Sequence, residues 1–172
     1  PKLPEQAVRF TVTCLKMEDG SKLWETLVVE GLPKFPIHGS NSFATESPAT
    51  DGQRLFVYFA AMGIVAAMDF DGNEVWRQDV GAYPTGNGFG SGSSLACGQG
   101  HVFVQCDNDD HSFVVAFDCA TGESTWRSDR AGRTSWSTPL LWENENRTEL
   151  ITCGSGYVTS YEPRTERIWS RK

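Results

Sequence analysis

Short segments of alternating or continuous apolar residues, separated by turns, predict a chain built from β-strands. The most regular stretch has predicted strands at 93–97, 101–106, 112–118 and 123–128. Gly98-Gln99-Gly100 separates the first two, and a polar run at 107–111 separates the next two. Strand segments of this length joined by turn residues form antiparallel hairpins, so the stretch predicts one four-stranded sheet.

The same order recurs before and after this stretch. The preceding unit has predicted strands at 46–50, 55–60, 64–69 and 74–80. The following unit has them at 135–141, 149–153, 157–161 and 167–171. Near the N-terminus only the last strands of a unit are expected, beginning with the alternating run at 8–15. The chain therefore divides into an incomplete unit at 1–36 and full units at 37–84, 85–130 and 131–172.

Four tryptophans end four copies of one short pattern. The third copy runs from Asp118 through Gly122 to Trp126, and a glycine holds the same place in the first two copies. Asp bonds the backbone of a tight turn and Gly accepts its positive φ, so the pattern predicts a hairpin. The tryptophans lie 52, 50 and 43 residues apart along the sequence, at Trp24, Trp76, Trp126 and Trp169. A strand-rich repeat of about 40–50 residues indicates a β-propeller with one blade per repeat, and each Trp is expected to pack against a neighbouring blade.

About three and a half four-stranded blades are predicted, whereas closed propellers have four to eight. An open array leaves strand edges and blade faces without neighbours. We therefore expect an all-β partial propeller that forms part of a seven- or eight-bladed ring. Self-association of such an open array is a second expectation.

The amino-acid composition disfavours several classes of function. The formal net charge of −7 disfavours a nucleic-acid surface. No apolar stretch is long enough for a membrane-spanning helix. Five cysteines without a CxxC pair are expected to be buried single thiols, and no metal site is predicted. The acidic run at 107–110 lacks the spacing of a calcium loop, so a solvated hairpin tip is expected there.

The third copy, at 115–126, resembles the A-x-D-x-x-T-G-x-x-x-W repeat of PQQ-type propellers, which include quinoprotein alcohol dehydrogenases and BamB-type outer-membrane assembly factors. The runs at 40–52 and 135–139 resemble BamB-like and PQQ-binding-like repeat proteins of bacteria. The first copy has Lys16 where the repeat has Asp, and the fourth lacks the turn glycine after Thr165. The resemblance implies the propeller fold. The PQQ enzymes hold their cofactor with adjacent cysteines and a calcium set of Glu, Asn and Asp, and this chain has no Cys-Cys pair, so we predict no cofactor.

Loops that enter the innermost strand of each blade converge on one face of a propeller, where ligands bind. Three such loops are rich in Gly, Asn and Ser, with charged and aromatic side chains among them. In the alternative interpretation, the Asn and Ser side chains cap turns and the arginines pair with carboxylates. The candidate ligand-binding residues are His38, Asn41, Ser42, Glu46, Asn87, Ser93, Arg130, Arg133, Ser135 and Trp136.

Three functions are consistent with this sequence. The leading hypothesis is a non-catalytic BamB-like scaffold in the bacterial periplasm, or another extracytoplasmic compartment, that binds a protein or polymer partner through these loops. A PQQ-dependent oxidoreductase, whose ligands for PQQ and calcium lie outside this segment, is one alternative. A carbohydrate-binding or hydrolytic propeller that uses Trp136 and the Asn- and Ser-rich loops is another. Separately, His38 and Glu46 are candidates for a general acid/base pair.

Overall fold

The computed structural model describes residues 3–154 and 156–171, and its regular structure is almost entirely β-strand. One 3₁₀ turn, η1 (Gly86–Gly88), interrupts the strands. The described residues include no helix that is long and apolar enough to cross a membrane.

The strands form one hairpin and three four-stranded antiparallel sheets, each wound in sequence order. The hairpin pairs β1 (Val8–Leu15) with β2 (Lys22–Gly31). The second sheet contains β3 (Ala49–Thr50), β4 (Leu55–Phe59), β5 (Ile64–Met68) and β6 (Glu74–Asp79). The third contains β7 (Ala96–Gly98), β8 (His101–Cys106), β9 (Phe113–Asp118) and β10 (Ser124–Asp129). The fourth contains β11 (Leu140–Glu143), β12 (Thr148–Gly154), β13 (Tyr157–Tyr161) and β14 (Ile168–Arg171).

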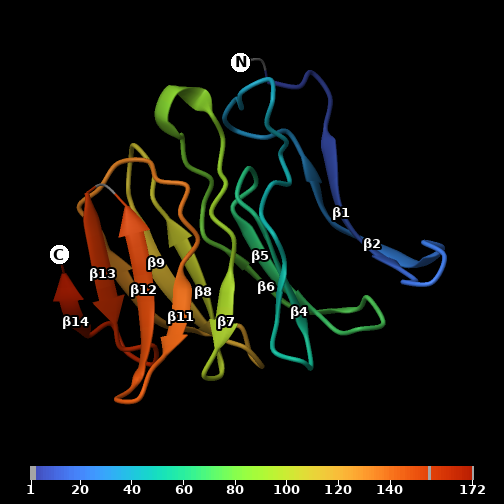
Figure 1. Cartoon of the computed structure of the whole chain (residues 1–172). Helices are drawn as coiled ribbons and strands as arrows, with labels where there is room; N and C mark the ends of the chain where they lie inside the picture. Colours follow the sequence, from blue (N-terminus) through green and yellow to red (C-terminus); the bar gives the residue numbers. More distant parts are fainter. Residues whose placement is uncertain (1–2, 155, 172) are drawn as a thin grey trace.

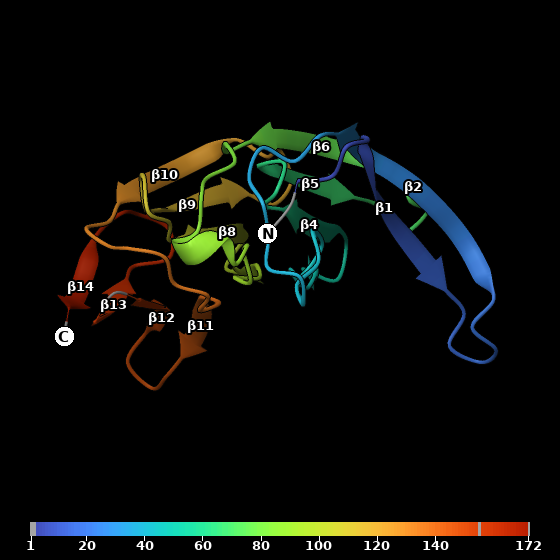
Figure 2. The ribbon, with the colours of Figure 1, turned by 90° about the horizontal axis from the view of Figure 1, so that it is seen from above.

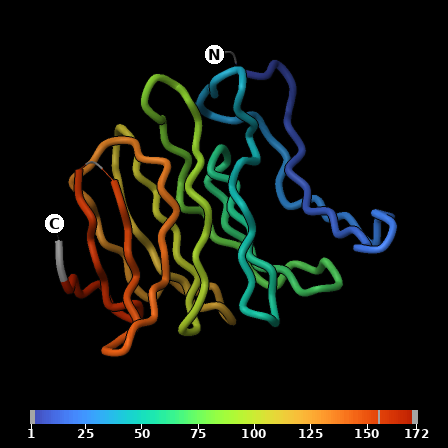
Figure 3. The backbone as a smooth tube through the Cα atoms, in the orientation of Figure 1, coloured from blue at the N-terminus to red at the C-terminus, as the bar shows by residue number. Residues whose placement is uncertain are grey.

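The sheets stand side by side as the blades of a partial propeller (Figure 1). Seen from above, the outer strands β2, β6, β10 and β14 follow one arc, and the earlier strands of each sheet lie inside it (Figure 2). This arrangement confirms the predicted all-β propeller with about three and a half blades. The inter-blade loops gather at one end of the blades and the turns of the repeat motif lie at the other (Figure 3).

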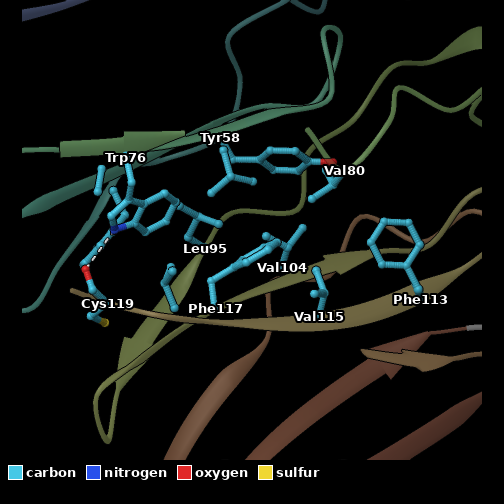
Figure 4. Packing of buried hydrophobic residues seen from close by; sticks show 13 residues of the cluster. Tyr58, Trp76, Val80, Leu95, Val104, Phe113, Val115, Phe117 and Cys119 are labelled. Atoms are coloured by element: carbon cyan, nitrogen blue, oxygen red, sulfur yellow. Dashed lines mark hydrogen bonds between the residues drawn. The ribbon is translucent and has the colours of Figure 1, made fainter. Parts of the chain in front are cut away.

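The hydrophobic core consists of layers between neighbouring sheets. Successive residues of a strand point to opposite faces, so Phe56 and Tyr58 of β4 pack toward the third sheet and Val57 and Phe59 toward the hairpin. The largest layer also contains Trp76 and is shown in Figure 4. Central strands are buried on both faces, which explains why their sequences are continuously apolar rather than alternating.

The motif tryptophans join each blade to the next one. The indole N–H of Trp24 donates to the carbonyl of Phe70 at 2.9 Å. Trp76 donates to the carbonyl of Cys119 and Trp126 to that of Pro163, each at 3.0 Å. Each acceptor lies in or beside the motif turn of the following blade, so the expected packing of the tryptophans against neighbouring blades is seen together with a directional hydrogen bond.

Trp169, in the fourth copy, has a different environment. Its indole nitrogen is buried and has no hydrogen-bond partner among the described residues. The guanidinium carbons of Arg147 and Arg167 each lie 4.4 Å from its ring centroid. Cation–π contacts therefore hold this ring.

The motif glycine has two roles, of which the sequence indicated one. Gly122 adopts φ +73°, as the hairpin requires, and its main-chain N–H donates to the carbonyl of Asp118 at 2.9 Å. A Cβ atom at Gly122 would also lie 2.5 Å from the ring of Trp76. A Cβ atom at Gly72 would likewise lie 2.8 Å from the ring of Trp24. The glycine therefore makes room for the tryptophan of the preceding blade.

The expectation of buried thiols is only partly correct. All five cysteines are free, but only Cys119 is buried and Cys153 is exposed. The other three are half-buried. The apolar pattern of a strand does not reveal how far the thiol at each position is exposed.

Replacing Trp126 tests the packing between the third and fourth blades. Trp126 stacks on Tyr161 with ring centroids 5.8 Å apart and also contacts Phe103. We expect Trp126→Ala to lower the free energy of unfolding by about 3–5 kcal/mol, through lost burial and a residual cavity. Trp126→Phe keeps an aromatic ring but leaves the Pro163 carbonyl unpaired, so a smaller loss of about 1–3 kcal/mol is expected. Denaturant titration measures both losses, and a loss below about 1 kcal/mol for Trp126→Ala would contradict the packing described.

Two glycine variants separate backbone strain from crowding. Gly20 and Gly122 hold the same motif position with φ +71° and +73°, but a Cβ atom at Gly20 would meet nothing within 4 Å. We expect Gly20→Ala to cost about 1–2 kcal/mol, the strain of a left-handed alanine. Gly122→Ala adds the clash with Trp76 and should cost clearly more in the same denaturant titration. Equal losses for the two variants would show that the glycine is needed for turn conformation alone.

Candidate functional site

Three inter-blade segments, residues 32–48, 80–95 and 130–139, form one face of the propeller; we call them the top-face loops (Figure 1). A repeated hydrogen bond connects them. The main-chain N–H of Ser47 donates to the Ser94 hydroxyl, and the main-chain N–H of Ser94 donates to the Thr138 hydroxyl, both at 2.9 Å. Neighbouring blades therefore order one another's loops, a link that the sequence did not indicate.

Two side chains strengthen this connection. The Asn41 amide donates to the carbonyl of Phe89 at 2.8 Å, and the Trp136 indole donates to the carbonyl of Gly90 at 2.8 Å. Gly90 has φ +86°, and a Cβ there would lie 2.7 Å from Ile37. The close approach of the loops therefore depends on this glycine.

An open aromatic groove lies on the outside of the loops and is lined by His38, Ser40, Asn41, Phe89 and Trp136. The His38 and Phe89 rings meet edge to face at 5.6 Å, and the Phe89 and Trp136 rings lie 6.0 Å apart at 37°. Phe89 is 42% exposed and Trp136 is 44% exposed. Nδ1 of His38 lies 2.7 Å from the Ser40 hydroxyl. Three predicted residues, from two different loops, therefore meet on one aromatic surface.

An inner cavity lies deeper, between the second and third sheets, with a volume of about 40 Å³. Four of the predicted residues, Ser42, Glu46, Ser93 and Ser135, line it. Side chains that the sequence did not single out complete its wall, among them Tyr58, Tyr83, Gln105, Cys106 and Asp107. Gln105 interrupts the apolar run at 102–106 of β8, and this interruption of the pattern was the signal available in the sequence.

His38 and Glu46, the possible acid/base pair, face different spaces. His38 lines the aromatic groove and Glu46 lines the inner cavity. The loop that carries both residues turns between them, with the main-chain N–H of Asn41 donating to the carbonyl of His38. Although His38 and Glu46 are only eight positions apart in the sequence, their side chains therefore do not share one site.

Burial controls the ionisation of the cavity residues. Desolvation raises the pKa of Glu46, and hydrogen bonding to Ser91 and to nearby main chain offsets only part of this rise. Burial also raises the pKa of the Cys106 thiol and raises that of Tyr58 well above its ordinary value. The thiol and phenol are therefore neutral near pH 7, and Cys106 lacks the thiolate character of a nucleophile.

Arg130 belongs to a buried ion pair. Its Nε donates to Asp107 Oδ1 at 2.8 Å, and its Nη1 donates to the Tyr161 hydroxyl at 3.1 Å and to the Thr152 hydroxyl. Asp107 also accepts from the Gln105 amide at 2.8 Å. Arg130 thus pairs with a carboxylate, as in the alternative interpretation, and its bonds to Thr152 and Tyr161 join the third blade to the fourth.

The solvated hairpin tip expected at 107–110 is wrong for its first two residues, because Asp107 and Asn108 are buried. The Asn108 side-chain oxygen accepts the main-chain N–H groups of Asp110 and His111, and its amide donates to the His111 carbonyl. A polar segment can be buried when the protein itself satisfies its hydrogen bonds.

The remaining two predicted residues are exposed. Asn87 lies in η1 with φ +56°, a conformation that asparagine tolerates better than most residues. Arg133 lies near Asp109, whose pKa is lowered mainly by hydrogen bonds from Thr134 and further by the Arg133 charge. Neither residue lines the groove or the cavity.

A family model described as outer membrane protein assembly factor BamB matches residues 8–172. The chain belongs to this BamB family. A search of curated proteins finds no match to the chain.

Solved structures share the propeller fold of this BamB family member. BamB from Moraxella catarrhalis has a TM-score of 0.58 and 15% identity, with 94% of this chain and 46% of that chain covered. A quinohemoprotein alcohol dehydrogenase from Pseudomonas putida has a TM-score of 0.61 and 14% identity, with 94% and 31% covered. A europium-containing methanol dehydrogenase has a TM-score of 0.52 and 19% identity, with 77% and 26% covered. The chain spans less than half the length of each, and identities this low show the fold alone.

The pH dependence of stability in this BamB family member tests the burial of Glu46. The ordinary pKa of this carboxyl, 4.5, is raised in the folded state, so the folded protein binds its proton more tightly than the unfolded chain. The contribution of protonated Glu46 to the stability of the fold is fully present below pH 4.5. It is lost as the pH rises through the pKa of Glu46 in the folded state. We expect Glu46→Gln to gain stability relative to the parent between pH 4 and pH 7, measured by denaturant titration. Glu123→Gln, at an exposed turn, is the control, and an equal gain for both variants would contradict the burial effect.

Proposed function

We propose that this chain is a non-catalytic, BamB-like propeller segment that binds a protein partner through its top-face loops. The observation that carries the proposal is the exposed aromatic groove built on hydrogen-bonded loops. Phe89 and Trp136 present large, partly exposed apolar surfaces close together. Aromatic side chains of this kind are concentrated among the residues that dominate protein–protein binding.

The order of the loops favours binding. Asn41 and Trp136 hold the backbone of the loop that carries Phe89, through the carbonyls of Phe89 and Gly90. A surface already ordered before binding loses less conformational entropy when a partner arrives. The net charge of −7 supports a partner with complementary positive charge, because long-range attraction speeds association.

The family description supports the same proposal. It names an outer membrane protein assembly factor, a role carried out between proteins. We propose an analogous role for this chain, with an extracytoplasmic location that matches that description.

The PQQ-dependent alternative has less support from the inner cavity. A volume of about 40 Å³ is too small for a tricyclic quinone. Its wall also presents the Glu46 carboxyl and the Gln105 carbonyl oxygen, which are poor partners for the carboxylates of PQQ. The cavity residues therefore do not fit this cofactor, and we propose that this segment holds no PQQ site of its own.

The carbohydrate alternative has one point in its favour, because exposed aromatic rings can stack on sugars. The two rings of the groove are inclined by 37° rather than coplanar. An angular surface of this kind suits an irregular peptide side chain better than the flat face of a sugar ring.

A groove variant with a matched control tests the partner proposal. Phe89→Ala removes an exposed ring but keeps the backbone carbonyl that Asn41 binds. Phe70→Ala removes a comparably exposed ring from a motif turn at the opposite end of the blades. In cells that depend on the protein, we expect Phe89→Ala to slow the appearance of folded, heat-modifiable outer membrane proteins at least about fivefold, the effect of losing one important contact. Phe70→Ala should remain close to the parent, and equal rates for the two variants would overturn the proposal.

Calorimetry tests the cofactor part of the proposal separately. PQQ titrated into the protein with calcium should give no saturable heat. Saturable binding that depends on stoichiometric calcium would instead favour the oxidoreductase.

A further inference from the structure

Unpaired buried polar atoms gather in the inner cavity. Among the described residues, four buried side-chain nitrogen or oxygen atoms have no hydrogen-bond partner. Three of them, Glu46 Oε2, Ser93 Oγ and Gln105 Oε1, belong to residues that line this one cavity. Ser93 is 4% exposed and Gln105 is 1% exposed. An unpaired buried polar group is destabilising, so the concentration of three such groups in one cavity indicates a binding site.

The hydrogen-bonding properties of these three atoms indicate what kind of ligand the cavity can bind. The Gln105 amide nitrogen donates to Asp107 at 2.8 Å and to the Cys153 carbonyl at 2.7 Å. These bonds fix the amide so that its oxygen, which can only accept, is the free atom. Glu46 Oε2 accepts when the carboxyl is ionised, and the Ser93 hydroxyl can accept as well. A ligand that binds all three oxygens must therefore be a hydrogen-bond donor.

The size and the walls of the cavity further restrict which ligand can bind. About 40 Å³ holds a small head group or about three water molecules, at roughly 10–15 Å³ each. Aromatic rings from Phe35, Phe43, Tyr58 and Tyr83 form part of the wall. Such rings stabilise a cation that lies against their faces.

We propose that the inner cavity binds a primary ammonium group, which donates one N–H to each of the Glu46, Ser93 and Gln105 oxygens. An ammonium carries three donors and no acceptor, which matches the number and type of the unpaired atoms. Its charge is balanced by the Glu46 carboxylate. The ammonium can belong to a small free amine or to a lysine of a bound polypeptide. The site is separate from the aromatic groove and does not depend on the partner proposed there.

NMR titration of the protein with n-butylammonium tests the site. We expect saturable shifts at the main-chain N–H groups of Glu46, Ser93 and Gln105. Tetramethylammonium has the charge without an N–H donor, and n-butanol has a similar chain without the charge, so neither should produce these shifts in the same concentration range. A capped pentapeptide with a single lysine, compared with its ε-acetyl-lysine form, distinguishes a polypeptide source from a free amine.

Two variants locate the binding atoms. Ser93→Ala removes a hydroxyl that has no hydrogen-bond partner in the part of the chain that the structure describes. Glu46→Gln removes the charge and is expected to stabilise the fold at neutral pH, so loss of binding cannot be attributed to unfolding. Because hydrogen bonds to charged groups are strong, we expect Glu46→Gln to weaken butylammonium binding at least about tenfold and Ser93→Ala to weaken it severalfold. Glu123→Gln, which removes an exposed carboxylate, should leave it unchanged.

Binding of either amine source with this variant pattern supports the proposal and identifies the source. Three results would overturn it: no saturable shift with any amine or with the lysine peptide, equal binding of tetramethylammonium, or unchanged binding in Glu46→Gln. In the first case the three oxygens bind water only.

Discussion

The fold depends on a contact between one blade and the next, in which a tryptophan packs on a turn glycine and donates to a carbonyl of the same turn region. Trp76 lies against Gly122 and bonds the Cys119 carbonyl. The contact places a large apolar ring between sheets and fixes their relative position through a directional bond. Hydrophobic burial has no preferred direction. The hydrogen bond is therefore the interaction that sets the register of one blade against the next.

This contact tolerates sequence change at the turn better than the motif suggests. The fourth copy has no glycine, and Trp126 nevertheless reaches the Pro163 carbonyl at 3.0 Å. The first copy has Lys16 in place of Asp, and the main-chain N–H of Lys16 still donates to the carbonyl of Ser21 at 2.8 Å. The turn is maintained by main-chain hydrogen bonds, and the side-chain cap is an addition to them.

With the blades in register, the top-face loops come within hydrogen-bonding distance of one another, and two different environments result. The aromatic groove presents apolar rings to the solvent, where their burial by a partner is favourable. The inner cavity presents oxygen atoms inside an aromatic wall, where an unpaired polar group is costly. The same loops thus carry both an exposed aromatic groove and a small cavity lined by oxygen atoms.

The sequence by itself determined the propeller, its motif turns and the three outer strands of each full blade, whereas the innermost strands β3, β7 and β11 begin three to five residues later than predicted. These features depend on short apolar or alternating runs and on Asp–Gly turn chemistry, both of which are set by residues close in the chain. It also indicated which loops form the candidate face. Only the tertiary structure decided how their residues are divided, with His38 in the groove, Glu46 in the cavity and Arg130 in an ion pair with Asp107. Contacts such as these join residues far apart in sequence, and local patterns carry no information about which distant polar groups satisfy one another.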